Sequence, residues 1–538
     1  MTRATVPSQP PNILWISFED TGPLYGCYGD PVARTPNIDR FAAQGWRWTN
    51  CFSTAGVCAP ARSAVITGMY AVSIGTHHMR TTHVHPAAPE MPTPYSAVVP
   101  HYVKCFTEYL RAAGYYCTNN AKTDYQFEPP VTAWDELGPH AHWRHRPDPE
   151  QPFFAVFNLV RSHESGAWPE KCPSPEFDPG DIQPPPYLPD TPAVREAMAR
   201  MYTHIAHNDR EFGALLRQLE EDGLAGNTWV FNWSDHGPLP RGKRWPYDAG
   251  IHVPLIVRGP GLAPGEVRDE LVSTVDLGPT VLSLAGVGTP RHIQGRAFLG
   301  DQAGPPRDYV HASRDRHDES YDMVRAVRDR RFKYIRNYRP DLPYLGWIPY
   351  RNRHPIVQEL WRLHLEGALD EAQSALFRYP RPVEELYDTA ADPHEIHNLA
   401  EDPRWRDELQ RMRRALDGWL DEVGDMGRMP ESEMVRSWYP DGRQPETAPV
   451  VCVPISPESP GIEPAPEGGT FAGPMLVQLH CATQGASIAY TRDTGDCPRW
   501  RLYTEPIRLS SGNHELRARA IRIGYRESRE IRARFVVK

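Results

Sequence analysis

Five short apolar runs constrain the fold of this chain more than any other feature of its sequence. They lack the polar alternation of half-exposed strands, as expected for strands buried on both faces of a parallel sheet. Segments with helical spacing lie between them, at 35–45, 60–67, 107–113 and 193–222. Strands that alternate with helices predict an α/β fold, a mostly parallel sheet sandwiched by helices. The five runs are 12–18, 115–118, 153–159, 228–233 and 253–257.

The pattern changes after this α/β core. A hairpin of half-exposed strands at 321–338, with its turn near Asp329, and an amphipathic helix at 403–423 predict a smaller α+β subdomain. A stretch rich in Pro, Glu and Ser then indicates a linker, and the short strands beyond it predict a β-sandwich. The predicted regions are 10–304 for the α/β core, 305–435 for the subdomain, 436–468 for the linker and 469–538 for the β-sandwich.

Composition excludes several classes of protein. The formal net charge of −9 disfavours nucleic-acid or anionic-membrane binding. No run approaches the ~18 apolar residues of a membrane span, and the N-terminus lacks the apolar core of a signal peptide. We therefore expect a cytoplasmic protein, or a periplasmic one if the native start is missing. Nine cysteines without a CxxC pair predict reduced thiols rather than disulfides or a zinc site.

Chemically reactive side chains follow four of the predicted strands. Ligands bind beyond the carboxyl ends of strands in an open parallel sheet, so these residues are expected to converge. Glu19, Asp20 and Asp235 would repel one another there unless a cation neutralised them. Carboxylate oxygens select a hard divalent ion, Ca²⁺ or Mg²⁺. Taken singly, each of these residues also fits a helix cap, a turn or a solvated side chain.

The segment 57–68 carries the most specific signal. Pro60 predicts a helix that begins just after Cys58, and the N-terminus of a helix is a ready anion site. Arg62 lies one turn beyond Cys58, so both side chains can face one pocket. A buried, inert thiol beside a surface arginine is the alternative interpretation.

These motifs together resemble a known family. Cys58, Pro60 and Arg62, followed by Thr67-Gly68, resemble the C-x-P-x-R signature of the formylglycine-dependent (type I) sulfatases in the alkaline phosphatase superfamily. The similarity extends over roughly 10–430. Stretches 73–80 and 114–125 are similar to the bacterial heparan N-sulfatase (sulfamidase)-like branch, and the tail resembles the β-module of chitobiase- and hexosaminidase-type enzymes. Further matching motifs are Glu19-Asp20, Asp235-His236-Gly237, Arg241-Gly242-Lys243, 247–250 and 385–399.

The resemblance implies both a reaction and the residues that perform it. It implies hydrolysis of a sulfate ester or sulfamate on a carbohydrate such as a glycosaminoglycan. The nucleophile would be Cys58, after a formylglycine-generating enzyme has oxidised it to formylglycine (3-oxoalanine). Arg62 would anchor the formylglycine. The implied cation ligands, for Ca²⁺ or Mg²⁺, are Glu19, Asp20, Asp235 and His236; the implied sulfate or leaving-oxygen contacts are Lys122, His163 and Lys243, with His163 as the expected general acid.

Three positions depart from the usual pattern of the family. Glu19 stands where aspartate is commoner, His236 where many members have asparagine, and Asp124 where many have histidine. We expect Asp124 to lie near the substrate, and His77, His78 and Arg80 to line the mouth of the site and meet an anionic sugar. A purely structural loop is the alternative for these residues.

Other functions are compatible with the same motifs. A phosphonate monoester or phosphodiester hydrolase of the superfamily is the second enzyme hypothesis, since sulfate and phosphate esters are similar in shape. A non-catalytic binding protein is the third. For the β-module we expect packing or homo-oligomerisation in preference to sugar binding, because the sequence shows no obvious aromatic platform.

Overall fold

The computed structural model describes residues 10–84, 92–238 and 240–538. The chain forms two compact units, which are described separately. The first contains the residues up to Arg80 and Val156–Arg428; the second contains Thr81–His83, Pro92–Ala155 and Met429–Lys538. No helix in the described ranges is both long and apolar enough to cross a membrane. The structure forms no disulfide among the nine cysteines, all of which it describes.

The large sheet of the first unit has the strand order β5-β1-β6-β7-β2-β8, with β9 beside β2. β1 and β6 are parallel and in register, from Asn12 opposite Thr228 to Phe18 opposite Ser234. The carboxyl ends of these two strands therefore meet at one edge of the sheet. The strands are β1 (Asn12–Phe18), β2 (Trp46–Phe52), β5 (Phe153–Leu159), β6 (Thr228–Ser234), β7 (His252–Arg258), β8 (Glu266–Arg268) and β9 (Val272–Ser273).

One strand runs against the predicted direction. The run 253–257 is the core of β7, which pairs antiparallel with both β6 and β2. The prediction of a parallel strand there is wrong. An uninterrupted apolar run indicates that a strand is buried on both faces. It does not indicate whether the strand is parallel or antiparallel to its neighbours. The other predicted strands of this unit are confirmed, and the sheet is mixed, with helices on both faces.

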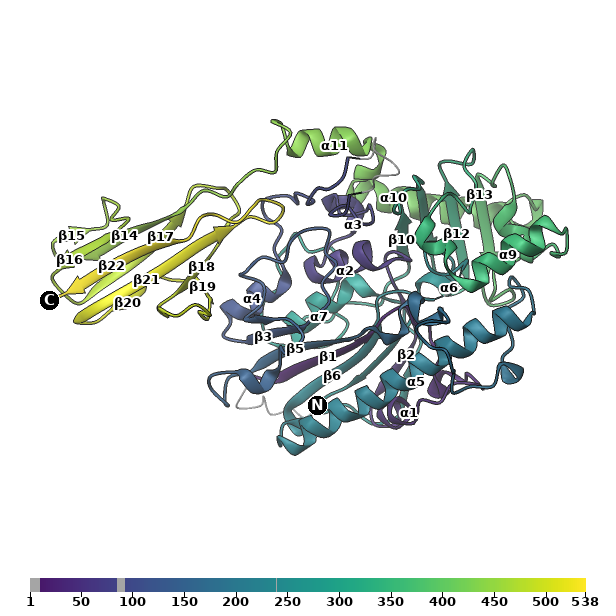
Figure 1. Cartoon of the computed structure of the whole chain (residues 1–538), viewed down its shortest axis with the longest axis horizontal. Helices are drawn as coiled ribbons and strands as arrows, with labels where there is room; N and C mark the ends of the chain where they lie inside the picture. Colours follow the sequence, from purple (N-terminus) through teal and green to yellow (C-terminus); the bar gives the residue numbers. More distant parts are fainter. Residues whose placement is uncertain (1–9, 85–91, 239) are drawn as a thin grey trace. The chain divides into compact units, whose positions relative to one another are not determined.

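Helices cover the sheet as the alternating pattern predicts. Figure 1 shows α5 (Pro192–Glu221) and α1 (Pro36–Ala43) on one face, with α2 (Cys58–Thr67) and α7 (Leu277–Leu284) on the other. Helix α2 begins at Cys58 itself, not after it, and Pro60 is its third residue. Proline fits there because the first four N–H groups of a helix have no partner within the helix.

A four-stranded antiparallel sheet follows in the first unit, in the order β10-β11-β12-β13. The predicted hairpin is confirmed as β11 and β12, and the Asp329 N–H donates to the Phe332 carbonyl at its turn. Helix α10 (Arg406–Val423) packs Met412, Leu416 and Trp419 into the core beneath this sheet. The remaining elements are α3 (Ala71–Ile74), α6 (Asp248–Ile251), β10 (Val310–Arg314), β11 (Val324–Arg328), β12 (Phe332–Asn337), α8 (Pro349–Asn352), α9 (Pro355–Leu365) and β13 (Glu384–Asp388).

The second unit contains helices α4 (Phe106–Ala112) and α11 (Glu431–Trp438), β3 (Tyr116–Asn120) with its short partner β4 (Glu136–Leu137), and a two-sheet β-sandwich. We call the sandwich, residues 450–538, the β-module. One sheet has the order β15-β14-β17-β20, the other β16-β22-β21-β18-β19. Its strands are β14 (Val450–Ser456), β15 (Ser459–Pro460), β16 (Gly468–Phe471), β17 (Met475–Cys481), β18 (Ser487–Thr491), β19 (Arg501–Leu502), β20 (Ile507–Leu509), β21 (Gly512–Ile521) and β22 (Ile531–Val537).

The segment predicted as a linker holds part of this sandwich. β14 lies inside the range 436–468 and pairs with β17, and alternate side chains of β14 are buried. The linker interpretation is wrong for this strand, because the proline-rich composition of the whole stretch concealed the short apolar run VVCVPIS. The other predicted region boundaries stay predictions.

Candidate active site

Four predicted cation ligands lie together where β1 and β6 end. The register of these parallel strands places Glu19 and Asp20 beside Asp235 and His236. The Asp20 N–H donates to Asp235 Oδ1 at 3.2 Å, and His236 Nε2 lies 3.1 Å from Asp20 Oδ1. All four residues are at most 2% exposed. Asp20 also holds a left-handed backbone (φ 48°), a strained conformation for a non-glycine residue.

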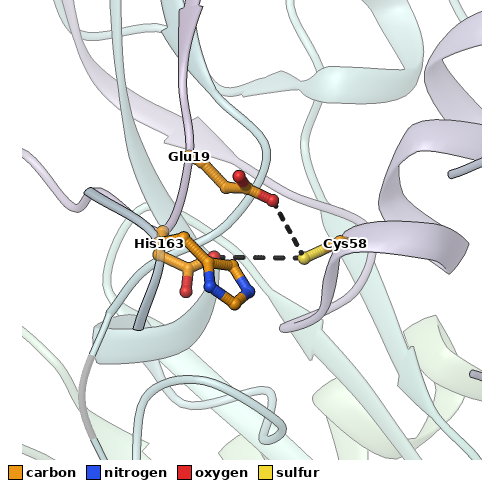
Figure 2. A group of neighbouring side chains, drawn as sticks. Glu19, Cys58 and His163 are labelled. Atoms are coloured by element: carbon orange, nitrogen blue, oxygen red, sulfur yellow. Dashed lines mark hydrogen bonds between the residues drawn. The ribbon is translucent and has the colours of Figure 1, made fainter. Parts of the chain in front are cut away.

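The Cys58 thiol faces this group from the first residue of α2. Its sulfur lies 3.6 Å from Glu19 Oε1, 4.0 Å from Asp20 Oδ1 and 3.2 Å from His236 Nε2. Figure 2 shows the Glu19 carboxylate directed at the sulfur, with the His163 ring nearby. The ligand atoms of two overlapping sets lie within 4.8 Å of one another: Glu19, Asp20, Cys58 and His163, and Asp20, Cys58, Asp235 and His236. Three buried carboxylates at this spacing fit a hard divalent cation.

Arg62 points into the same site but holds a carboxylate. Its Nε donates to Asp235 Oδ2 at 2.9 Å and its Nη1 donates to Asn158 Oδ1 at 2.8 Å. Asn158, on β5, also accepts from the Ser17 hydroxyl. The predicted contact of Arg62 with a formylglycine stays a prediction. Sequence reasoning missed Asn158, although an asparagine inside the apolar run FFAVFNL was a usable signal.

Lys243 connects the cation ligands to His163. Its ammonium lies 2.6 Å from Asp20 Oδ2, 3.3 Å from Glu164 Oε1 and 3.4 Å from His163 Nε2. Burial would raise the pKa of Asp20, but Lys243 and His236 lower it below its usual value. Burial would lower the pKa of Lys243, but Asp20 and Glu164 raise it. Lys243 is therefore a protonated donor at neutral pH.

Glu164 and Arg244 complete this charged network and were missed from the sequence. Two hydrogen bonds join them, at 2.8 and 2.6 Å, and both side chains are buried. The Glu164 N–H also donates to Asp20 Oδ2 at 2.7 Å. Burial would raise the pKa of Glu164, but Arg244 and then Lys243 hold it well below its usual range. The adjacency of Glu164 to His163 and of Arg244 to Lys243 was the available signal.

His163 lies at the site in a neutral form. Burial and the neighbouring Lys243 charge lower the pKa of its imidazole below the ordinary value. A neutral imidazole accepts a hydrogen bond but holds no extra proton to give, whereas Lys243 does. The general-acid role expected of His163 stays a prediction.

The three residues expected at the mouth differ in exposure. His77 and His78 are 2% and 6% exposed, and burial together with His77 holds the pKa of His78 well below its usual value. The Arg80 side chain is 28% exposed and pairs with Asp318 at 2.9 Å. Its guanidinium lies 4.9 Å from the ring centroid of Tyr350, whose ring is 6.3 Å from that of His163. Arg80 is thus linked to the site through Tyr350, while substrate contact by His77 and His78 stays a prediction.

Lys122 and Asp124 belong to the second unit. Their side chains pair at 3.2 Å, and the Asn119 side-chain amide donates to the Lys122 carbonyl at 3.0 Å. Their expected contacts with the sulfate stay predictions.

Comparison with protein families gives three matches along the chain. The sulfatase family model matches residues 11–136 and 141–287. A model described as N-sulphoglucosamine sulphohydrolase, C-terminal, matches 236–343, and the chitobiase/beta-hexosaminidase C-terminal domain matches 466–532. These matches confirm the resemblance drawn from the motifs.

Individual proteins agree with the family matches. An ulvan-active sulfatase of Formosa agariphila is 41% identical, over 98% of this chain and 92% of its own length. The human N-sulphoglucosamine sulphohydrolase is 28% identical, over 78% of this chain and 91% of its own. A solved structure in complex with its substrate D-glucosamine-2-N,6-O-disulfate matches in fold, with a TM-score of 0.56 at 17% identity, over 78% of this chain and all of that one. The site at the ends of β1 and β6 is therefore that of an alkaline phosphatase-like fold, and the chain belongs to the sulfatase family of sulfuric ester hydrolases.

Proposed function

We propose that this chain hydrolyses a sulfate ester or sulfamate on a carbohydrate, with Cys58 converted to formylglycine as the nucleophile. One observation carries the proposal: the Cys58 sulfur lies within 4.0 Å of Glu19, Asp20 and His236 at the first turn of a helix. An inert core thiol is expected to pack among apolar side chains. A thiol that faces a cluster of buried carboxylates is instead placed as expected for a nucleophile that meets an anionic substrate beside a cation.

Glu19, Asp20, Asp235 and His236 would hold the divalent cation. Arg62 pairs with Asp235 and Lys243 pairs with Asp20, so part of the negative charge of the buried carboxylates is already neutralised. When bound, the cation supplies positive charge at an oxyanion, which matters because a sulfate monoester repels nucleophiles. The carboxylates also fix where that charge lies.

The remaining groups would act on the substrate. Lys243, protonated and buried, would donate to a sulfate or leaving oxygen, and the N-terminus of α2 would add positive potential. Neutral His163 would accept from Lys243 and orient it. Hydrated formylglycine would supply two hydroxyls. One would attack sulfur as the sugar alcohol or amine leaves; the other would then lose its proton, so that the aldehyde re-forms as its bond to sulfate breaks. Glu164 and Arg244 would hold Lys243 and Asp20 in place.

The carbohydrate assignment rests on the relatives together with Arg80. The two curated relatives are named for ulvan and for N-sulphoglucosamine. In this chain Arg80 offers a partly exposed cation beside Tyr350, close to His163. A guanidinium and an aromatic ring suit an anionic sugar.

A substrate panel tests the proposal. Protein made together with a formylglycine-generating enzyme is assayed on sulfated oligosaccharides, N-sulfated glucosamine, an aryl sulfate and an aryl phosphonate ester. Sulfate release that is fastest on one of the sugars is expected. Faster cleavage of the phosphonate ester than of every sulfate would show that the second hypothesis, a phosphonate monoester hydrolase, is the correct one.

A further inference from the structure

The β-module lacks the surface that a sugar-binding module would need. Among residues 450–538, all of which the structure describes, the exposed large apolar side chains are Ile462 and Val536, and neither is aromatic. Trp500 is half-buried, and the Arg519 guanidinium lies 4.1 Å from its ring centroid. Sugars stack on open aromatic faces, whereas the aromatic side chains of this module are buried or half-buried. Its contacts within the second unit indicate a different role.

Arg111, on α4, ties the module to the loop that follows β3. Its side chain is 2% exposed. Nη2 donates to the Trp500 carbonyl of the module and to Asp135 Oδ1, both at 2.7 Å. Nη1 donates to the carbonyls of Val131 and Thr132, at 3.2 and 2.6 Å. A buried guanidinium on α4 whose four acceptors lie in the loop 131–135 and in the module fixes these segments relative to α4.

Two glycines let the module approach the backbone of residues 97–104 closely. A Cβ at Gly485 would lie 2.1 Å from the His101 carbonyl oxygen, and one at Gly524 would lie 2.3 Å from the Ala97 oxygen. Lys104 then donates to the Gly485 carbonyl at 2.5 Å and to the Ser487 hydroxyl at 2.8 Å. Figure 1 shows β19 of the module beside α4, the helix that follows this segment. The docking is specific, because any side chain at these two positions would collide with backbone.

A chain of hydrogen bonds leads from this docking surface to Lys122. Asp135, held by Arg111, accepts from the Cys117 N–H of β3 at 2.8 Å. The Gly138 N–H donates to the Asn119 carbonyl at the end of β3, and the Asn119 side chain donates to the Lys122 carbonyl at 3.0 Å. The position of the Lys122 backbone thus depends on a strand and a loop that Arg111 secures.

We propose that the β-module is a docked support for the Lys122 loop, and that Arg111 is the positioning residue through which docking reaches that loop. The catalytic part of this inference rests on the proposed function and on the contact between Lys122 and the sulfate that the family resemblance implies. The module then serves sulfate hydrolysis without binding sugar. Loss of docking loosens β3 and misplaces the Lys122 ammonium.

The test compares two glycine substitutions in the full-length protein. Gly485→Ala introduces the clash with His101, whereas Gly442→Ala is the matched control: both glycines have a left-handed backbone (φ 78° and 68°), but a Cβ at Gly442 meets nothing within 4 Å. Hydrogen exchange of amides 116–124 is measured by mass spectrometry. Exchange roughly tenfold faster in Gly485→Ala and unchanged in Gly442→Ala is expected. Wild-type exchange in Gly485→Ala and in Arg111→Lys would overturn the proposal, whatever the activity.

A double-mutant cycle tests the link to catalysis. Gly485→Ala and Arg111→Lys are each expected to lower kcat/KM for an aryl sulfate by roughly tenfold, and to cause little further loss in a Lys122→Ala background. The same fold-loss in both backgrounds would overturn the proposal, since docking would then act independently of Lys122. If the wild-type protein releases no sulfate from any substrate, the proposed function fails, and the exchange measurement still decides on docking.

Discussion

Arg62 and Asp235 form a buried ion pair beside the candidate nucleophile, Cys58. Their Nε and Oδ2 atoms are 2.9 Å apart, and their side chains are 5% and 0% exposed. Arg62 Nη1 donates a second hydrogen bond, to Asn158 Oδ1. The arginine of the C-x-P-x-R motif therefore fixes a candidate cation ligand as well as facing the nucleophile. A lone buried carboxylate would be costly, so this pair decides how Asp235 is oriented.

Arg62→Lys is expected to lower kcat for an aryl sulfate by roughly 10²-fold with a smaller change in KM. Lysine keeps the charge but lacks the planar fork whose two nitrogens donate separately to Asp235 and Asn158. Steady-state kinetics measure the effect, and exposed Arg40→Lys is the matched control. Equal kinetics for both variants would show that the fork of Arg62 is not needed.

Addition of Ca²⁺ to chelator-treated protein is expected to raise its thermal midpoint. A cation that binds only the folded state stabilises it by about 2.7 kcal/mol when present at a hundred times its dissociation constant. Asp235→Asn removes one carboxylate from the site and should abolish most of the shift. Differential scanning calorimetry measures it, with the exposed Asp301→Asn as control. If Ca²⁺ raised the thermal midpoint of Asp235→Asn as much as that of the wild type, the cation would bind at another site.

Glu164→Gln is expected to destabilise the protein by about 3–5 kcal/mol, because it leaves the Arg244 guanidinium buried without its carboxylate. The double variant Glu164→Gln with Arg244→Met removes the stranded charge and should recover much of that loss. Urea unfolding followed by intrinsic fluorescence measures both variants. A single variant within about 1 kcal/mol of wild type would mean that solvent reaches the pair.

The sequence predicted the part of the site that directly follows buried strands. The strand pair β1 and β6 fixes Glu19, Asp20, Asp235 and His236 through register, so the apolar runs alone predicted that they converge. Asn158, Glu164 and Arg244 escaped prediction because their roles arise from tertiary pairing, which leaves no periodic signal. The direction of β7 and the strand β14 escaped prediction for other reasons: burial does not encode strand direction, and averaged composition conceals a short apolar run.

The buried His311 side chain is expected to make the folded protein less stable in mild acid. It stacks on Trp419 with centroids 4.7 Å apart, and burial together with the Arg307 charge lowers its pKa to about 3. The His311 side chain of the unfolded chain takes up a proton near pH 6.5, and that of the folded chain does not. The contribution of neutral His311 to the free energy of unfolding is therefore complete above pH 6.5 and is lost as the pH falls toward 3.

His311→Phe keeps a stacked ring and removes the titration. The stability lost between pH 7 and pH 5 is expected to be smaller than in wild type by at most about 2 kcal/mol, because one proton is no longer taken up on unfolding. Urea unfolding at the two pH values measures this difference. An equal loss in both proteins would show that His311 stays accessible to protons in the folded state.

The chemical state of residue 58 tests the central claim most directly. Mass spectrometry of the peptide that contains Cys58, from protein produced with a formylglycine-generating enzyme, is paired with sulfate release by the same sample and by Cys58→Ala and Cys27→Ala. The account predicts an aldehyde in place of the thiol at Cys58, full activity in Cys27→Ala and none in Cys58→Ala. Sulfate release by a sample whose Cys58 is an unmodified thiol, or equally fast release by Cys58→Ala and the wild type, would contradict it.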